Sequence, residues 1–290
     1  MASGTGRIDL HLHTNISDGT DTPEELLKNI RKAGLTVFSV TDHDSFKGAV
    51  SISAMLCGED PVFITGVEFS CKDEEGKYHI LGYGFDPSAQ AINDTVRIGH
   101  GFRMEKMTVR FEFLKNEFGF RFPQDEIESV LALDNPGKPH LGNLMARYGF
   151  AENKDDAIRN YINKLHVNEK YIRPEQAIEG ILKSGGIPVL AHPLFGSGDE
   201  KISHVEMADR LTKLTEYGLQ GVEAFYSGFD TQQTAEMLDF AEQYSLYVTA
   251  GSDYHGSNKK IEIASTGLNE NDEMPEGLRE FLKAVGVWRI

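Results

Sequence analysis

The sequence is poor in cysteine and in basic residues for its length. Only Cys57 and Cys71 occur among 290 residues. They form neither a CxxC pair nor a disulfide framework, so we expect a reducing compartment, with the cytoplasm as the default. Lys and Arg number 29 against 45 Asp and Glu, which gives a formal net charge of −16. We therefore expect no binding to duplex DNA, because such binding draws its affinity from Lys and Arg contacts to phosphates.

Long apolar runs are also missing. No stretch approaches the ~20 residues needed to cross a bilayer, so no membrane partner is expected. A chain with 40% hydrophobic and 26% charged residues has the composition of a folded globular protein. Its length suffices for one large α/β domain or two ordinary ones. A small anionic substrate is still compatible with the negative net charge of the chain if bound metal ions reverse the sign of the electrostatic field at the site.

Predicted strands alternate with predicted helices in the first and last parts of the chain. The Thr22-Pro23-Glu24-Glu25 segment has the capping box and the proline that start a helix. Asp73-Glu74-Glu75-Gly76 predicts a hairpin turn. The alternation favours a mainly parallel sheet with crossover helices. Strands are expected at 7–13, 35–41, 62–69, 78–85, 187–191, 221–226 and 246–250.

The middle of the chain has a different pattern. From about Ser88 to Tyr171 the periodicity is helical throughout. We therefore predict a helical insertion at 88–173. Residues 1–87 plus 174–290 would form one α/β domain. Five closely spaced phenylalanines of the insertion are expected to form its core rather than a platform for bases; they are Phe111, Phe113, Phe118, Phe120 and Phe122.

His11-Leu12-His13 is the strongest local signal, at the end of the first predicted strand. Residues two apart on a strand point to the same face, so both imidazoles face one site while Leu12 faces away. Two histidines placed in this way can bind one divalent metal ion. Alone, such a pair is only suggestive.

Further histidines and carboxylates stand at other strand ends. Six of the ten histidines fall at or beside a predicted strand end, and the carboxyl edge of a parallel barrel is where catalytic groups collect. His, Asp and Glu suit Zn, Mn or Fe without any thiolate. The segments concerned are Ser17-Asp18-Gly19, Thr41-Asp42-His43-Asp44, Gly66-Val67-Glu68, His79, Ala191-His192-Pro193 and Ser252-Asp253-Tyr254-His255.

In this order the motifs resemble those of the polymerase and histidinol phosphatase (PHP) family. The resemblance covers most of the chain and is nearest to the stand-alone phosphoesterases with a helical insertion, including the tryptophan-operon-associated type. It implies a distorted TIM-like barrel, (β/α)7, of seven parallel strands with two or three divalent ions (Mn, Fe or Zn) at its carboxyl rim.

Carried over residue by residue, the resemblance implies three metal sites in the domain of 1–87 plus 174–290, with the insertion at 88–173 as the roof of the active site. The first would be held by His11, His13, Glu68 and Asp253. Glu68 would bridge to a second ion held by His79 and His192. The third would be held by Asp18, His43 and His255.

Four polar residues are candidates for supporting roles. Asp42 and Asp44 are interpreted as groups that orient His43 or its neighbours. Asp44 could equally cap the helix that follows. The resemblance further implies that Arg103 binds substrate phosphate, a role that suits the forked donors of guanidinium. His140 would bind phosphate or protonate the leaving oxygen.

The expected function is hydrolysis of a phosphate monoester of a small nucleotide, such as a 3′,5′-bisphosphonucleotide, by a metal-bridging hydroxide. Two alternatives within the resemblance are a 5′-to-3′ exoribonuclease acting on short RNA and a metal-binding module without catalytic activity. A positive channel leading to the metals would favour the exoribonuclease. An amidohydrolase, which shares the histidine-rich rim, is disfavoured by the number of phosphoesterase motifs.

Overall fold

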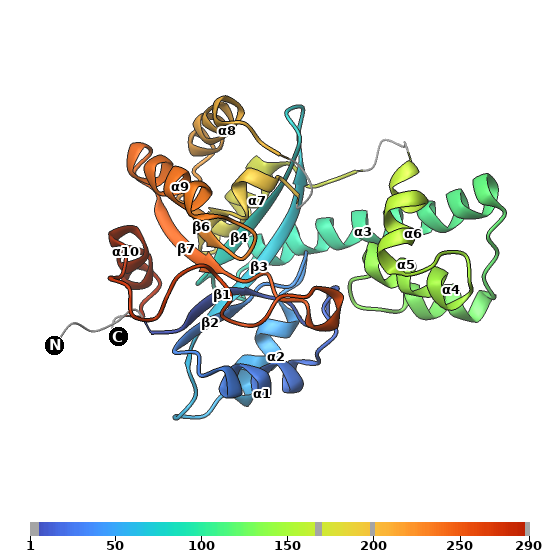
Figure 1. Ribbon diagram of the computed structural model, residues 1–290, viewed down its shortest axis with the longest axis horizontal. Coiled ribbons are helices and arrows are strands. Elements are labelled where there is room, and N and C mark those ends of the chain that lie inside the picture. The colour runs from blue at the N-terminus through green and yellow to red at the C-terminus, as the bar shows by residue number, and fades with distance from the viewer. Residues whose placement is uncertain (1–5, 166–169, 198–200, 288–290) are drawn as a thin grey trace.

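Seven strands form one nearly closed barrel in the computed structural model, which describes residues 6–165, 170–197 and 201–287 (Figure 1). The strands are hydrogen-bonded in the order of the sequence. A bridge between Leu12 and Tyr254 links the segment after the last strand to the end of the first. The strands are β1 (Ile8–Leu12), β2 (Val37–Val40), β3 (Val62–Lys72), β4 (Lys77–Tyr83), β5 (Ile187–Leu190), β6 (Gly221–Tyr226) and β7 (Tyr247–Gly251).

One strand departs from the all-parallel barrel that the family resemblance implied. Strand β4 pairs antiparallel with both β3 and β5, while the other neighbouring pairs are parallel. The reason is the tight turn at 73–76, since two strands joined by so short a connection must run in opposite directions. The expectation of seven parallel strands was therefore wrong, and the predicted hairpin was right. Because β4 is reversed, its first residues lie at the carboxyl rim of its neighbours.

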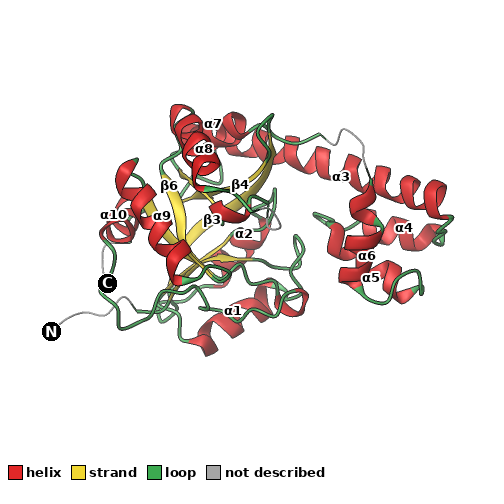
Figure 2. Ribbon diagram, turned by 45° about the horizontal axis from the view of Figure 1, so that its top comes forward, coloured by secondary structure: helices red, strands yellow, loops and turns green. Residues whose placement is uncertain are grey.

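Helices cover the outside of the barrel (Figure 2). The start of the first follows the predicted signals, because Thr22 and Glu25 form a capping box and Gly34 ends the helix with a φ of 68°. The strands of the sheet are buried on both faces, by the barrel interior and by these helices. The helices are α1 (Pro23–Ala33), α2 (Lys47–Met55), α7 (Pro174–Lys183), α8 (His204–Glu216), α9 (Thr231–Gln243) and α10 (Glu276–Ala284).

Between β4 and β5 the described residues are mainly helical, as predicted. Helix α3 (Gln90–Phe118) runs from the barrel to a group of shorter helices, α4 (Gln124–Leu131), α5 (Lys138–Arg147) and α6 (Lys154–Asn160) (Figure 1). This group has a hydrophobic cluster of its own. The separate cluster supports our proposal that 88–173 is an insertion into a barrel domain. All five predicted phenylalanines pack in it: Phe111, Phe113, Phe118, Phe120 and Phe122.

The described part of the chain also contains three short 3₁₀ turns, η1 (Ile162–Lys164), η2 (Pro193–Phe195) and η3 (Gly256–Asn258). The last two directly follow His192 and His255. Among the described residues, no helix is both long and apolar enough to cross a membrane.

Phe281 tests how much the barrel depends on α10. Its ring is fully buried, with the ring of Tyr83 edge-on at 5.3 Å. Because Phe281→Ala would leave a cavity, we expect it to lower the free energy of unfolding by about 3–5 kcal/mol, measured by urea denaturation. Val205→Ala, at a helix position with 69% exposure, should stay within about 0.5 kcal/mol of the wild type. Equal effects of the two substitutions would contradict the assignment of α10 to the core.

Candidate metal centre

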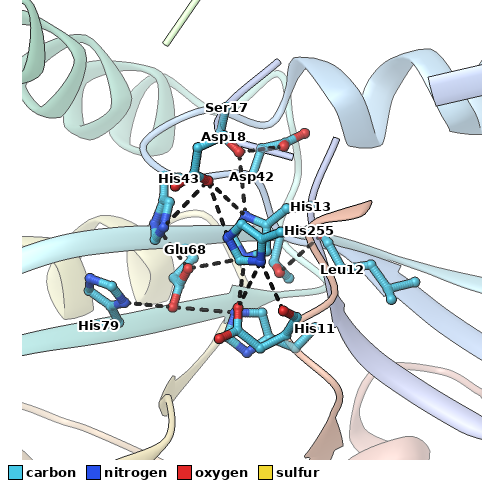
Figure 3. Close-up of polar contacts among 12 residues, drawn as sticks. His11, Leu12, His13, Ser17, Asp18, Asp42, His43, Glu68, His79 and His255 are labelled. Atoms are coloured by element: carbon cyan, nitrogen blue, oxygen red, sulfur yellow. Dashed lines mark hydrogen bonds and ion pairs between the residues drawn. The ribbon is translucent and has the colours of Figure 1, made fainter. Parts of the chain in front are cut away.

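The predicted histidines and carboxylates converge at one rim of the barrel (Figure 3). His11 and His13 extend from the end of β1 with ring centroids 5.2 Å apart, and Leu12 points away from them (Figure 3). His79 reaches the same rim although it stands near the start of its strand, because β4 is antiparallel. The motifs that the sequence placed at separate strand ends are therefore neighbours in space.

Glu68 lies at the centre of the group. Its side chain is fully buried and both carboxylate oxygens face imidazole nitrogens. Oε1 lies 3.3 Å from His11 Nε2, 2.9 Å from His79 Nδ1 and 3.3 Å from His192 Nε2. Oε2 lies 3.3 Å from His13 Nε2 and 2.9 Å from His43 Nδ1. One carboxylate of β3 thus connects side chains from β1 and β4 with side chains from the segments that follow β1, β2 and β5.

The first predicted ligand set is compact. Asp253 Oδ1 lies 3.5 Å from both His11 Nε2 and His13 Nε2, and the same two nitrogens lie 3.3 Å from Glu68. Ligand atoms about 2.0–2.2 Å from a tetrahedral ion are separated from one another by about 3.3–3.5 Å. The spacing of these four side chains therefore fits one divalent ion.

The second predicted set consists of Glu68, His79 and His192. His79 Nδ1 and His192 Nε2 are 3.2 Å apart, and each lies within 3.3 Å of Glu68 Oε1. Two imidazole nitrogens this close would repel each other if both presented a lone pair, unless a proton or a metal ion were shared between them. This contact therefore also suits a metal ion.

The third predicted set surrounds Asp18. Its Oδ1 lies 3.2 Å from His255 Nε2, 3.8 Å from His43 Nε2 and 3.9 Å from His13 Nδ1. These four side chains form a group that could hold a metal ion. Both nitrogens of His13 and of His43 thus face carboxylates, one shared with the Glu68 group and one with Asp18.

Unpaired buried atoms support the fit of metal ions to these residues. His11 Nε2, His13 Nε2, His43 Nδ1, Glu68 Oε2 and Asp18 Oδ1 are buried without a hydrogen-bond partner. Buried polar atoms in folded proteins nearly always have a partner. Here the unpaired atoms point at one another, and nitrogen and oxygen are the donors that Zn, Mn and Fe take.

Burial and mutual charge set the protonation of the cluster. Burial alone would raise the pKa of Glu68, but His79, His43 and His11 outweigh it and hold the pKa well below the usual range. Burial also lowers the pKa of His79 and of His255 to about 4. The carboxylate is therefore ionised and these two imidazoles are neutral at pH 7, which is the form that binds metal.

His13 behaves differently. Burial would lower its pKa, but the carboxylates of Asp253 and Glu68, 3.5 and 3.3 Å from its Nε2, outweigh that effect and raise the pKa to about 9. The pKa of His11 is also raised, because the negative charges of Glu223 and Glu68 outweigh burial. Without a metal ion, protons on these rings balance the charge of the carboxylates.

Glu223 is a residue of the site that the sequence analysis missed. It is fully buried, lies 2.9 Å from His11 Nδ1 and accepts a hydrogen bond of 2.8 Å from the backbone N–H of His192. It therefore orients one ligand of each of the first two sets. The available signal was an acidic residue at the centre of the buried Gly221–Tyr226 strand.

Asp253 has two further partners that the sequence analysis also missed. Tyr226 donates a hydrogen bond of 3.0 Å to Asp253 Oδ2, and Lys259 Nζ lies 2.5 Å from the same oxygen. The remaining oxygen, Oδ1, faces His11 and His13. These partners leave one carboxylate oxygen directed at the first ligand set.

Asp42 and Asp44 have distinct contacts. Asp42 accepts hydrogen bonds from the backbone and hydroxyl of Thr14 and from Ser17, whose hydroxyl lies 3.4 Å from His13 Nδ1. It thus holds the loop that follows β1, and a role in orienting neighbours of His43 stays a proposal. The alternative that Asp44 caps the next helix was wrong, because α2 begins after Phe46 without a side-chain cap.

The carboxylate of Asp44 binds Arg103 instead. Arg103 donates to Asp44 Oδ2 from Nε at 3.0 Å and from Nη2 at 2.6 Å, and Nη2 also donates to Ser70. This pairing fixes the guanidinium at the wall of a pocket that Asp18 and His43 also line. Asp44 therefore positions the predicted phosphate-binding residue rather than a predicted metal ligand.

His140 lies at the edge of the site. Its Nδ1 accepts a hydrogen bond of 2.9 Å from Gly137 N–H, and burial lowers its pKa while Asp18 raises it. Gly137 and Pro139 line the pocket beside the metal centre, whereas the His140 side chain lines a neighbouring pocket in the insertion. A role in binding or protonating substrate stays a proposal.

Comparison with known proteins decides the family. Residues 9–180 match the PHP domain. The chain belongs to the PHP family. A solved structure from Bifidobacterium adolescentis, described as a metal-dependent phosphoesterase, superposes on this PHP protein with a TM-score of 0.80 and 26% identity, over 97% of this chain and 96% of its own.

Three curated relatives of this PHP protein catalyse different reactions. A phosphoribosyl 1,2-cyclic phosphate 1,2-diphosphodiesterase from Eggerthella lenta is 28% identical, over 87% of this chain and 95% of the relative. A 5′-3′ exoribonuclease from Haemophilus influenzae is 27% identical, over 87% and 90%. A 3′,5′-nucleoside bisphosphate phosphatase from Chromobacterium violaceum is 25% identical, over 86% and 87%. The PHP protein is accordingly a metal-dependent hydrolase of phosphoric esters.

Metal uptake by the PHP protein should release protons. His13, with a pKa of about 9, carries a proton at pH 7 and must lose it to bind a metal ion. Affinity for Mn²⁺ should therefore rise with pH up to about 9. Calorimetric titration of the metal-free protein at pH 7, in two buffers of different ionisation enthalpy, should give binding heats that differ between the buffers. Identical heats in both buffers would contradict this protonation state.

Glu223→Gln should weaken Mn²⁺ binding by about 10-fold to 100-fold, because residues that orient metal ligands contribute about that much to affinity. The substitution keeps the volume of the side chain and removes the charge beside His11 Nδ1. Glu242→Gln, on the exposed surface of α9, is the matched control and should bind like the wild type. If calorimetry gave the same affinity for both variants, Glu223 would have no role in holding the ligands.

Proposed function

We propose that this chain hydrolyses a phosphate monoester of a small nucleotide, such as a 3′,5′-bisphosphonucleotide. The observation that carries the proposal is the convergence of five imidazoles on the buried carboxylate of Glu68 beside a pocket that contains Arg103. Divalent ions held there would activate water and neutralise the charge of the phosphoryl group. Membership of the tryptophan-operon-associated branch stays a prediction.

The residues have separate tasks in this proposal. The three ligand sets described above hold the ions, with Glu68 shared between the first two. Arg103, fixed by Asp44 and Ser70, orients the phosphate through its remaining N–H donors. Because His140 Nδ1 accepts a hydrogen bond from the Gly137 N–H, the neutral imidazole carries its proton on Nε2. We propose that this atom donates to the leaving oxygen or to the phosphate.

A pocket volume of about 240 Å³ favours a small substrate, since it lies below the usual range for ligand sites, about 300–1,000 Å³. A second candidate function, 5′-to-3′ exoribonuclease activity on short RNA, is supported by the basic residues that line the same pocket. The relative from Haemophilus influenzae also supports it.

A phosphate-release assay distinguishes these functions. The purified protein would be incubated with Mn²⁺, and with chelator in parallel, on adenosine 3′,5′-bisphosphate, mononucleotides, histidinol phosphate and a 5′-phosphorylated trinucleotide. We expect release of phosphate from the bisphosphate that stops with chelator. Cleavage of the trinucleotide to mononucleotides without phosphate release would instead support the exoribonuclease.

Two substitutions connect this activity to the cluster. Asp253→Asn should lower turnover at least about 100-fold, since it removes a charge that faces His11 and His13. Asp239→Asn, an exposed position on α9, should retain full activity. Absence of turnover on every substrate, despite bound metal, would refute the proposed function and favour a metal-binding module without catalysis.

A further inference from the structure

Two polar side chains of the insertion contact the backbone of loops that carry predicted metal ligands. Asn135, in the loop between α4 and α5, is fully buried and donates a hydrogen bond from Nδ2 to the backbone oxygen of His43. Lys154, the first residue of α6, donates a hydrogen bond of 2.5 Å from Nζ to the backbone oxygen of Asn258. The two acceptors belong to the segments that follow β2 and β7 at the carboxyl rim of the barrel.

Asn258 connects Lys154 to the third ligand set. The side chain of Asn258 donates a hydrogen bond of 2.8 Å to the backbone oxygen of Asp18. Its backbone N–H donates one of 3.3 Å to the backbone oxygen of His255. The same residue is thus bonded to the insertion and to the segments that carry two ligands of the third set. Lys154 therefore contacts these segments indirectly, through one asparagine.

The loop before α5 lies close to the same ligand set. A Cβ atom at Gly137 would lie 3.5 Å from Asp18 Cβ and 3.6 Å from Arg103 Nη1. The backbone of the insertion is therefore in direct proximity to a predicted ligand. A further contact of this loop, the ion pair of Lys47 with Asp134, is exposed, so it contributes little to holding the loop on the barrel.

The first two ligand sets are oriented by residues of the barrel instead. Glu223 of β6 bonds to the ring of His11 and to the backbone of His192. Tyr226, at the end of the same strand, donates a hydrogen bond to Asp253. These contacts do not involve the insertion. The third set therefore differs from the other two in the part of the chain that orients its ligands.

The segments of the third set need such contacts. Its ligands come from the ends of three strands, β1, β2 and β7, and from the loops that follow them. Fixing several loops in one geometry costs conformational entropy. Hydrogen bonds that hold the backbone of a ligand before an ion binds reduce this cost, and metal affinity depends strongly on how the ligands are oriented.

We propose that Asn135 and Lys154 are positioning residues through which the insertion completes the third metal site. Packing of the insertion on the barrel and occupancy of that site are then linked. By reciprocity, an ion bound by the third set should stabilise the docked insertion as much as the docked insertion stabilises the ion. The inference rests on the proposed metal-dependent function, but it concerns the assembly of the metal centre and not the substrate.

Lys154→Met tests this link, because it removes the ammonium donor and keeps most of the side-chain length. Binding of Mn²⁺ to the metal-free protein would be measured by calorimetry, with the bound manganese counted by elemental analysis. We expect three ions for each wild-type chain. In the variant one ion should bind about 10-fold to 100-fold more weakly, the usual effect of losing a residue that orients metal ligands. The other two should bind within about 2-fold of the wild type.

Asn135→Leu removes the other donor at similar side-chain volume and should weaken the same single ion. Because Asn135 is fully buried, this variant may lose stability as well. The side chain of Lys154 is 17% exposed, so Lys154→Met decides the matter if Asn135→Leu does not fold.

The matched controls lie in the insertion too. Lys115→Met, half exposed and close to Glu112 on α3, and Asn143→Leu, exposed on α5, should bind three ions like the wild type. Equal weakening of all three ions in Lys154→Met would mean that Lys154 supports the structure only, and would overturn the inference. Unchanged binding in that variant, or a wild type that binds only two ions, would also overturn it.

A second readout follows the insertion itself. Amide hydrogen exchange in α5 and α6 would be compared with and without saturating Mn²⁺. In the wild type, Mn²⁺ should slow exchange in these helices at least about 10-fold, and in Lys154→Met most of this protection should be lost. Equal exchange with and without Mn²⁺ in the wild type would contradict the link. A wild type that binds no Mn²⁺ would refute the proposed function as well, whereas three ions bound equally well by all variants would refute this inference alone.

Discussion

The structure of the site depends on the burial of one carboxylate, Glu68, among five imidazoles. An ionised carboxylate without exposure to water is costly unless cations or hydrogen-bond donors surround it. Here the surrounding nitrogens come from β1, from β4 and from the segments after β1, β2 and β5, with contacts of 2.9–3.3 Å. Closure of the barrel therefore brings together the imidazoles that surround Glu68. The negative charge of Glu68 is then balanced either by protons on His11 and His13 or by divalent ions. Protonation, metal binding and stability thus all depend on this one carboxylate.

Backbone geometry at the rim is strained where these side chains meet. Five described residues other than glycine have positive φ, and three of them belong to the site: Asp44 at 47°, His192 at 28° and Asp253 at 59°. Such conformations cost about 1–3 kcal/mol each and persist where surrounding contacts impose them. The hydrogen bonds of Asp44 to Arg103 and of His192 N–H to Glu223 are contacts of this kind. These backbone conformations direct the side chains of His192 and Asp253 to the metal centre and that of Asp44 to Arg103 at the pocket.

Sequence patterns predicted the elements and the convergence of motifs, because strand ends and the i, i+2 spacing of His11 and His13 depend on local geometry alone. They did not predict the direction of β4, although the hairpin turn implied it. Nor did they identify Glu223 or Lys259, since a single acidic residue in a buried strand and a loop lysine have no local pattern that marks a function. The lining of the pocket beside the metal centre was equally hidden, because Lys77, Lys106 and Tyr171 come from three distant segments that only tertiary structure assembles.

A crystal structure of the protein grown with Mn²⁺, with anomalous data collected at the manganese edge, would show whether the buried cluster binds metal. At least two anomalous peaks are expected at the barrel rim, with both oxygens of Glu68 within about 2.0–2.3 Å of an ion and with His11, His13, His79 and His192 among the other ligands. Saturating Mn²⁺ with no peak beside Glu68, and its oxygens still directed at protonated imidazoles, would mean that this buried cluster is not a metal centre.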